Sequence, residues 1–318
     1  MMRQPERHRS SCGYGVQQDD VLLETEALGE AWLAAMRRGD FLAAWRVSDR
    51  VLAERRTAGP CFALPRHEQW VWDGRPLAGQ RVLVRCYHGL GDTIQFARLL
   101  PRLAQIARRV AVWAQPALIP LLQTLPARLH VLPLHDGTPE VDYDVDIESM
   151  ELAHALRISL ATLPEAVPYL HVPPDPRLSP HFSVGLLARA GGWDPRRSVP
   201  TRQLAALARL PGVHAFSLQL DEPIPGACDI STADVWTLAR RVQALDLVIT
   251  VDTMLAHLAG ALAVPTWLLL PAEADWRWMA ERQDSPWYPT LRLFRQPAPG
   301  DWSSVLQAVT DALHEARA

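Results

Sequence analysis

The fold class is indicated by residues 81–93, which read RVLVRCYHGLGDT. The first six residues form a valine-rich apolar run that predicts a short buried strand. Gly89 and Gly91 then permit a close backbone approach, and Asp92 stands where an amphipathic helix over 93–107 begins. A strand that leads through glycines into a helix starts a βαβ unit, and the free N–H groups at such a helix start attract an anion.

Strands and helices alternate on both sides of a proline-rich segment at 164–180, which we interpret as a linker. Before it, strands are predicted at 81–86, 110–113 and 129–132, with helices at 93–107 and 116–125. After it, strands are predicted at 183–187, 213–218, 247–250 and 266–270, with helices at 201–209, 235–244, 253–263 and 302–316. Strict alternation implies parallel strands with right-handed crossovers, so the sequence predicts two Rossmann-like halves.

The N-terminal part of the chain has a different pattern. Residues 1–20 are polar and predict a disordered lead-in, whereas 21–59 show helical periodicity interrupted at Gly39-Asp40. The resulting helical hairpin resembles a single tetratricopeptide unit, and an ordinary helical cap on the next domain explains the pattern equally well. We therefore expect a lead-in over 1–20, a hairpin over 21–59 and two Rossmann-like domains over 60–178 and 179–318.

The composition narrows the class of partner. A formal charge of −3 does not favour nucleic acid, and neither a signal peptide nor a membrane span is evident, so we expect a cytoplasmic protein. All 32 basic residues are Arg, so a phosphate clamp must use Arg, hydroxyls or backbone N–H groups. The four cysteines form no CxxC pair, which favours neither a zinc ribbon nor a disulfide framework.

Three turns that follow predicted strands carry candidate chemistry, because ligands gather at the carboxyl ends of parallel strands. In the turn at 89–93, Asp92 is either a general base facing the cleft or a helix cap. In the turn at 251–257, Thr253 and His257 share one helix face suited to a diphosphate or ribose, with a capping Asp252 and an inward-packed His257 as the alternative. In the loop at 191–197, arginines either clamp a phosphate or are solvated.

Two further clusters have more than one interpretation. The alternation Asp142, Asp144, Asp146 invites a metal site, although alternation on a strand would place all three carboxylates on one face. The second cluster is aromatic and consists of Trp276, Trp278, Trp287 and Tyr288. It is either a stacking wall for a base or sugar or, as we favour, a packed lid whose polar ring edges find local partners.

Three stretches together resemble a known module: HGLGDTIQFARLLPRLA, LDLVITVDTMLAHLAGALAVPTWLLLP and DWRWMAERQDSPWYPTLRLFRQPAPGDWSSV. They are similar to the glycosyltransferase module of bacterial tetratricopeptide-repeat proteins, which is related to glycosyltransferase family 9, the heptosyltransferases. The resemblance implies a GT-B fold, in which two Rossmann-like parallel-sheet domains face each other across a cleft. It implies that 60–178 is the acceptor domain and 179–318 the nucleotide-sugar-binding domain. It also implies inverting transfer without a bound metal, with a nucleotide-diphosphate sugar as donor substrate and no other cofactor.

The resemblance also assigns roles. Asp92 matches the general base, Asp252, Thr253 and His257 match the donor motif D-T/S-x-x-x-H, and Arg197 falls where heptosyltransferases have a phosphate-binding Lys. This chain departs from the pattern at Tyr87-His88, at 142–146 and in the short loop after Gln219. The candidate site comprises the catalytic Asp92, the donor-binding Gly91, Thr93, Arg197, Gln219, Asp252, Thr253 and His257, and the acceptor or lid residues His88, Asp144, Asp275, Trp276 and Arg277, with no metal ligand.

The predicted function is sugar transfer from a nucleotide-diphosphate sugar to a hydroxyl of a glycan, lipid or protein. A non-catalytic nucleotide-sugar sensor, or a scaffold that binds a protein through its hairpin, is the alternative from another class. A GT-B-like epimerase or phosphorylase is a third hypothesis.

Overall fold

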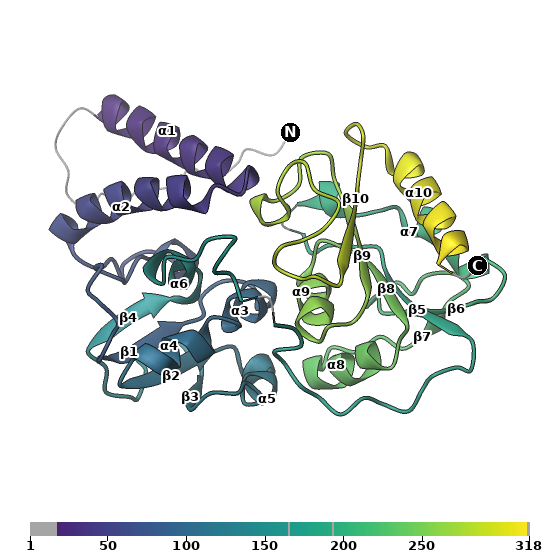
Figure 1. Ribbon diagram of the computed structural model, residues 1–318, viewed down its shortest axis with the longest axis horizontal. Helices are drawn as coiled ribbons and strands as arrows, with labels where there is room; N and C mark the ends of the chain where they lie inside the picture. The colour runs from purple at the N-terminus through teal and green to yellow at the C-terminus, as the bar shows by residue number, and fades with distance from the viewer. Residues whose placement is uncertain (1–17, 165, 193, 317–318) are drawn as a thin grey trace, which may run out of the picture.

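The computed structural model describes residues 18–164, 166–192 and 194–316 of the chain. It is an α/β fold with two parallel sheets, as predicted (Figure 1). The first sheet has the order β3-β2-β1-β4 and consists of β1 (Arg81–Arg85), β2 (Arg109–Ala114), β3 (Leu129–Pro133) and β4 (Val145–Glu148). The second has the order β10-β9-β8-β5-β6-β7 and consists of β5 (Phe182–Leu187), β6 (Val213–Ser217), β7 (Cys228–Asp229), β8 (Leu247–Val251), β9 (Thr266–Leu270) and β10 (Leu291–Arg295).

The helices surround these sheets, and several are shorter than predicted. They are α1 (Gln18–Arg37), α2 (Phe41–Ala58), α3 (Leu90–Ala97), α4 (Leu100–Ile106), α5 (Ile119–Leu122), α6 (Leu152–Ala155), α7 (Thr201–Leu204), α8 (Val235–Gln243), α9 (Met254–Ala261) and α10 (Trp302–Glu315). The single helix predicted over 93–107 is instead α3 followed by α4. Pro101 has no N–H to continue the hydrogen-bond ladder, and it lies in the first turn of α4.

The helices α1 and α2 form a hairpin that we call the N-terminal hairpin (18–58). Its first helix begins at Gln18, so residues 18–20 are helical rather than part of a disordered lead-in, and residues 1–17 lie outside the described part. The turn between the helices places Gly39 at φ +75°, which glycine adopts without a steric penalty. Within the described residues, no helix combines the length and apolarity needed to span a membrane.

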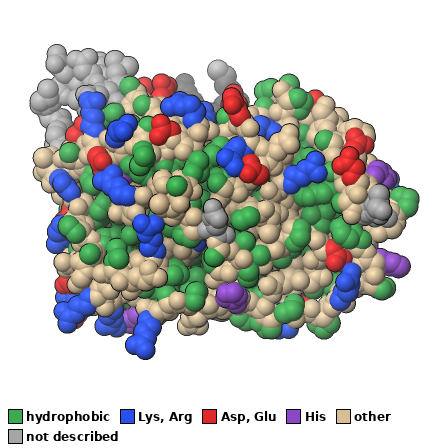
Figure 2. Space-filling model, viewed as in Figure 1, with side chains coloured by type: hydrophobic (Ala, Val, Ile, Leu, Met, Phe, Trp, Pro, Cys, Tyr) green, Lys and Arg blue, Asp and Glu red, His purple; other side chains and the backbone are tan. Residues whose placement is uncertain are grey.

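One continuous apolar core connects the N-terminal hairpin, the first sheet and the helices α8 and α9 of the second sheet. Phe41 of α2, for example, packs on Trp287 with ring centroids 5.8 Å apart. A separate core lies between the second sheet and α10. On the face seen in Figure 2, arginines and carboxylates are scattered among apolar side chains.

Candidate functional site

A polar pocket of about 630 Å³ lies where the loops after β1, β4, β5, β8 and β9 meet. We call it the polar pocket. The part of the chain built on the first sheet contributes His67, His88, Gly89, Leu90, Gly91, Asp92 and Met150, and the part built on the second contributes Gly191, Arg197, Asp252, Thr253, Met254, His257, Asp275 and Arg277. Because the strands of each sheet are parallel, these loops gather at the carboxyl ends, where α/β proteins bind ligands.

Asp92 both caps its helix and faces this pocket. Its Oδ2 accepts a hydrogen bond from the backbone N–H of Gly89 at 3.0 Å, in the first turn of α3. Its Oδ1 accepts one from Nη2 of Arg277 at 2.5 Å, across the boundary between the two halves. Asp92 therefore caps α3 and also lines the polar pocket, while its role as a general base stays a prediction.

Arg277 is buried and its guanidinium is fully engaged. Nε donates to Oε1 of Gln95 at 2.7 Å, and Nη1 donates to Oδ1 of Asp275 at 2.9 Å. The planar group also lies over the ring of Trp276, 4.6 Å from its centroid. With Asp92 as the third acceptor, Arg277 connects α3 to the loop after β9.

The helix α9 begins in the pocket with Thr253 as its N-cap, whose Oγ1 accepts from the N–H of Leu255 at 3.3 Å. One turn later His257 is buried, stacked on Trp278 and hydrogen-bonded through Nδ1 to the Tyr288 hydroxyl at 3.0 Å. Burial, together with the nearby arginines, lowers the pKa of His257 to about 3. The imidazole is therefore uncharged at neutral pH and offers a polar contact rather than a positive charge.

Arg197 and Asp252, which also belong to the part of the chain built on the second sheet, line the polar pocket next to the start of α9. Nη1 of Arg197 donates to the carbonyl oxygen of Asp252 at 3.0 Å and lies 3.9 Å from its Oδ2. Burial raises the pKa of Asp252 to about 6, and the neighbouring Asp275 adds to this effect. The adjacent Arg196 instead pairs with Asp194 outside the pocket, and Trp193 of this loop lies outside the described residues.

Four candidate residues do not line the polar pocket. Thr93 is buried beneath it and donates to Oε1 of Gln115 at 3.0 Å. Gln219 is buried at the end of β6, where its Oε1 accepts from the N–H of Arg189 at 2.9 Å and so fixes the loop after β5. Trp276 faces the space under the N-terminal hairpin instead. The side-chain groups of Thr93 and Gln219 hydrogen-bond to neighbouring loops rather than line the polar pocket, and their assignment to the donor site stays a prediction.

Asp144 is the fourth, and it lies at the opposite end of the first sheet. It immediately precedes β4 and forms an ion pair with Arg81 at the start of β1, at 2.7 Å. Asp146 is buried and pairs with Arg85, at 2.8 Å. Asp144 and Asp146 are therefore bound to arginines of β1. Within the described ranges, no three His, Cys, Asp or Glu side chains are grouped to hold a metal ion.

Two acidic residues that no sequence motif indicated, Glu148 and Glu151, also lie at the site. Both are held beside the polar pocket, in a side pocket of about 330 Å³ that shares His67, His88 and Met150 with it. Burial raises the pKa of Glu148 to about 8 and that of Glu151 to about 7. Glu148 ends β4, but no strand is predicted over 145–148 from the sequence, so the rule of strand carboxyl ends could not be applied there.

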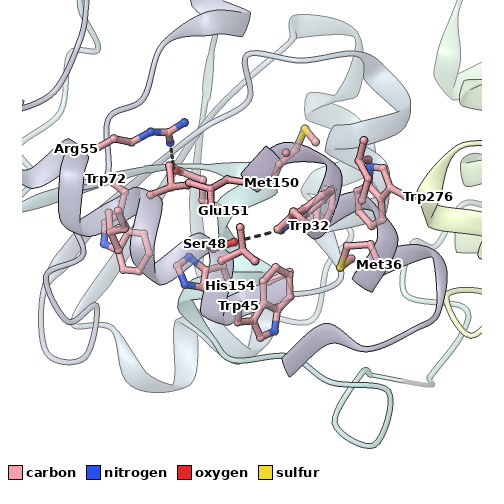
Figure 3. A pocket seen from close by; sticks show the side chains of 18 of the residues that line it. Trp32, Met36, Trp45, Ser48, Arg55, Trp72, Met150, Glu151, His154 and Trp276 are labelled. Atoms are coloured by element: carbon pink, nitrogen blue, oxygen red, sulfur yellow. Dashed lines mark hydrogen bonds and ion pairs between the residues drawn. The ribbon is translucent and has the colours of Figure 1, made fainter. Parts of the chain in front are cut away.

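The aromatic cluster is packed rather than arranged as a stacking wall, but not every ring edge finds the local partner that we expected, and a role as a lid stays a prediction. Trp278, Trp287 and Tyr288 are fully buried, although Nε1 of Trp287 finds no hydrogen-bond partner among the described residues. Trp276 remains half-buried beside a second, largely apolar space of about 490 Å³, which we call the hairpin cavity (Figure 3). Met150 lines the hairpin cavity, the side pocket and the polar pocket alike.

No family model matches the chain. Among curated proteins it resembles Protein FlbA of Caulobacter vibrioides, with 24% identity over 344 residues. This alignment covers 93% of the chain but 56% of FlbA, so the chain spans little more than half the length of that relative.

Two solved structures that share the fold are glycosyltransferases. The E. coli ADP-heptose LPS heptosyltransferase II superposes with a TM-score of 0.52 at 14% identity, over 75% of this chain and 100% of that chain. A glycosyl transferase family 9 protein from Veillonella parvula superposes with a TM-score of 0.51 at 11% identity, over 74% and 90% of the two chains. The fold is therefore that of the heptosyltransferases, as the resemblance implied.

Proposed function

We propose that this protein is a GT-B-type glycosyltransferase that transfers a sugar from a nucleotide-diphosphate sugar to an acceptor hydroxyl. The polar pocket carries this proposal, because it places Asp92 of one half opposite Arg197, Thr253 and His257 of the other. The fold shared with an ADP-heptose enzyme supports it. We infer in addition that the first half binds the acceptor and the second half binds the donor.

The donor diphosphate lies at the start of α9. The N–H groups of the first helical turn and the Arg197 guanidinium supply the positive potential there. His257 is uncharged and contributes hydrogen bonding, while Asp252 suits a ribose hydroxyl rather than a phosphate.

Transfer proceeds by direct displacement. Asp92 accepts the proton of the acceptor hydroxyl. At the same time the hydroxyl oxygen of the acceptor attacks the anomeric carbon, and the bond from that carbon to the diphosphate oxygen breaks. Attack opposite the leaving group inverts the anomeric configuration. Arg197 and the α9 N-terminus stabilise the charge that develops on the departing diphosphate, so the residues present provide for the leaving group without a metal.

Asp92→Asn tests this mechanism. Loss of a general base lowers the rate by roughly 10²–10⁴-fold, and we expect release of nucleoside diphosphate from an accepted nucleotide sugar to fall accordingly. Binding of ADP, measured by calorimetry, should change far less, because Asp92 does not contact the proposed diphosphate site. Full transfer activity in Asp92→Asn would exclude Asp92 as the base.

A second candidate function is nucleotide-sugar binding without transfer. It is favoured by the ion pair between Asp92 and Arg277, because a guanidinium N–H is already bound to Oδ1 of the proposed base. A nucleotide sugar that binds the wild-type chain but is neither transferred nor hydrolysed would support this candidate.

A further inference from the structure

The polar pocket is connected to the N-terminal hairpin through two consecutive residues, Trp276 and Arg277. Arg277 holds Asp92 and Gln95 of α3, and its guanidinium rests on the ring of Trp276. The outer part of Trp276 contacts Trp32 of α1 edge to face, with ring centroids 5.2 Å apart. Figure 3 shows these two tryptophans next to each other at one end of the hairpin cavity.

A backbone contact strengthens this connection. The N–H of Ala280, just after η6 (Trp276–Trp278), donates to the carbonyl oxygen of Arg37 at the end of α1, at 2.9 Å. Gly39 in the turn of the hairpin approaches Met279 so closely that an added Cβ would lie 3.3 Å from its sulfur. The segment that carries Arg277 is therefore held by α1 at two places.

The same hairpin is anchored to the first half through α2. Nε1 of Trp45 donates to the carbonyl oxygen of Ile158 at 2.6 Å. Asp49 binds His154 at 2.8 Å and Arg157 at 2.6 Å. The hairpin thus connects the half that contains Asp92 to the loop that contains Arg277.

We propose that the N-terminal hairpin is part of the candidate site, and that Trp32 is a positioning residue that acts through Trp276 to hold Arg277 against Asp92. A free arginine side chain samples many rotamers, and fixing one costs conformational free energy. Stacking on Trp276, which Trp32 holds in turn, offsets that cost. The consequence for sugar transfer rests on the proposed function, whereas the placement of Arg277 does not.

A measurement without ligand tests the placement. In ¹⁵N–¹H spectra of the full chain, the Nε–H of Arg277 should give a dispersed, slowly exchanging signal because it donates to the buried Gln95, and Arg277→Lys assigns it by removing it. Trp32→Leu should move this signal toward the free-arginine position and speed its exchange with water at least tenfold. Trp32→Phe, which keeps a ring against Trp276, should largely retain it.

Trp72→Leu is the matched control. Trp72 lines the same hairpin cavity, but in Figure 3 it lies at the opposite end from Trp276. It should leave the Arg277 signal in place. An unchanged Arg277 signal in Trp32→Leu, or an equal change in Trp72→Leu, would overturn the proposal, and Trp276→Leu provides the same comparison if Trp32→Leu does not fold.

A second measurement extends the test to catalysis. With any nucleotide sugar that the wild type turns over, Trp32→Leu should lower kcat about as much as Arg277→Lys does and leave donor KM within about twofold. The double variant should be no slower than the slower single variant, because residues acting through one another are not additive. If the losses in kcat of the two single variants add up in the double variant, Trp32 does not act through Arg277, and the proposal is overturned. If the wild type turns over no donor, the proposed function fails, and the ¹⁵N–¹H comparison still decides the role of the hairpin.

Discussion

Arg196 and Arg197 are neighbours in the chain but have different surroundings, which makes them a matched pair for testing the donor site. Arg197 faces the polar pocket, whereas Arg196 is exposed and bound to Asp194. We expect Arg197→Gln to weaken ADP binding by roughly 10–100-fold, since a charged hydrogen bond contributes about 1.5–3 kcal/mol. Arg196→Gln should change it less than about twofold. Calorimetric titration compares the two, and equal effects would remove Arg197 from the donor site.

The raised pKa of the buried Glu148 makes the free energy of unfolding depend on pH. Its pKa rises from 4.5 in the unfolded chain to about 8 in the buried site. Between these values the folded state holds more protons than the unfolded state, so the free energy of unfolding should fall as pH rises from about 4.5 to 8. Glu148→Gln carries no titrating group and should be more stable than the wild type at pH 9 by roughly 2–4 kcal/mol.

Urea denaturation at pH 5, 7 and 9 measures this difference. Glu148 faces His88, Glu151 and Cys86, and Glu68→Gln, an exposed position in the same side pocket, is the control. Parallel stability profiles for Glu148→Gln and the wild type would contradict the prediction.

Residues that follow strands were the predictable part of the site. Asp92, Asp252 and Thr253 line the polar pocket because parallel strands bring their carboxyl ends to one edge. Thr93 and Gln219 were assigned by nearness in sequence, which does not tell whether a side chain faces the pocket or the loop beneath. The contact between Asp92 and Arg277 spans 185 residues, and no local pattern predicts such a pair.

At the level of elements, the approach of α3 to α9 is set by a glycine. A Cβ on Gly91 would lie 2.9 Å from Cδ2 of His257 and 3.3 Å from Cα of Met254. We expect Gly91→Ala to destabilise the fold, because overpacking costs about 1–3 kcal/mol and exceeds the roughly 1 kcal/mol that alanine gains in a helix. ADP binding should weaken as well, because α9 is displaced.

Gly191→Ala is the control for this substitution. Gly191 also lines the polar pocket, but a Cβ there would meet no atom of the described residues within 4 Å. Thermal unfolding of both variants tests the prediction, which fails if Gly91→Ala is as stable as Gly191→Ala.

Long apolar strands were predicted well, and short or polar elements were not. β8 and β9 are buried at every position and match their predicted ranges closely. β4 carries Asp146 and Glu148, whose buried charges obscure the strand pattern, and β7 has two residues. The tetratricopeptide interpretation of the N-terminal hairpin stays a prediction, since it concerns repeats that a single hairpin cannot display.

For the whole molecule, the shared apolar core predicts cooperative unfolding. The hairpin, the first sheet and the helices α8 and α9 bury their side chains in one cluster. We therefore expect a chain without residues 1–59 to melt at a clearly lower temperature and to bind a hydrophobic dye, because Trp287 and its neighbours lose the cover of Phe41. Calorimetry of the two chains measures this, and an unchanged melting temperature would show that the hairpin adds no stability.

The alternation of strands and helices along the sequence predicts two parallel sheets. It does not predict how the two sheets are placed relative to each other. Buried contacts between distant residues fix that placement, such as the guanidinium of Arg98 bonded to the carbonyl oxygens of Trp287 and Pro164. Such contacts depend on tertiary packing rather than on local sequence, so the polar pocket became visible only in three dimensions.

Met150 has a consequence for how the molecule could be re-engineered. Its unbranched thioether lines the polar pocket, the side pocket and the hairpin cavity at once. We expect Met150→Ala to enlarge the space between Asp92 and the tryptophans of the hairpin cavity, because the side chain common to both hollows is shortened. Substitution of Met150 is therefore the first change to make in order to widen the range of molecules that this scaffold accommodates.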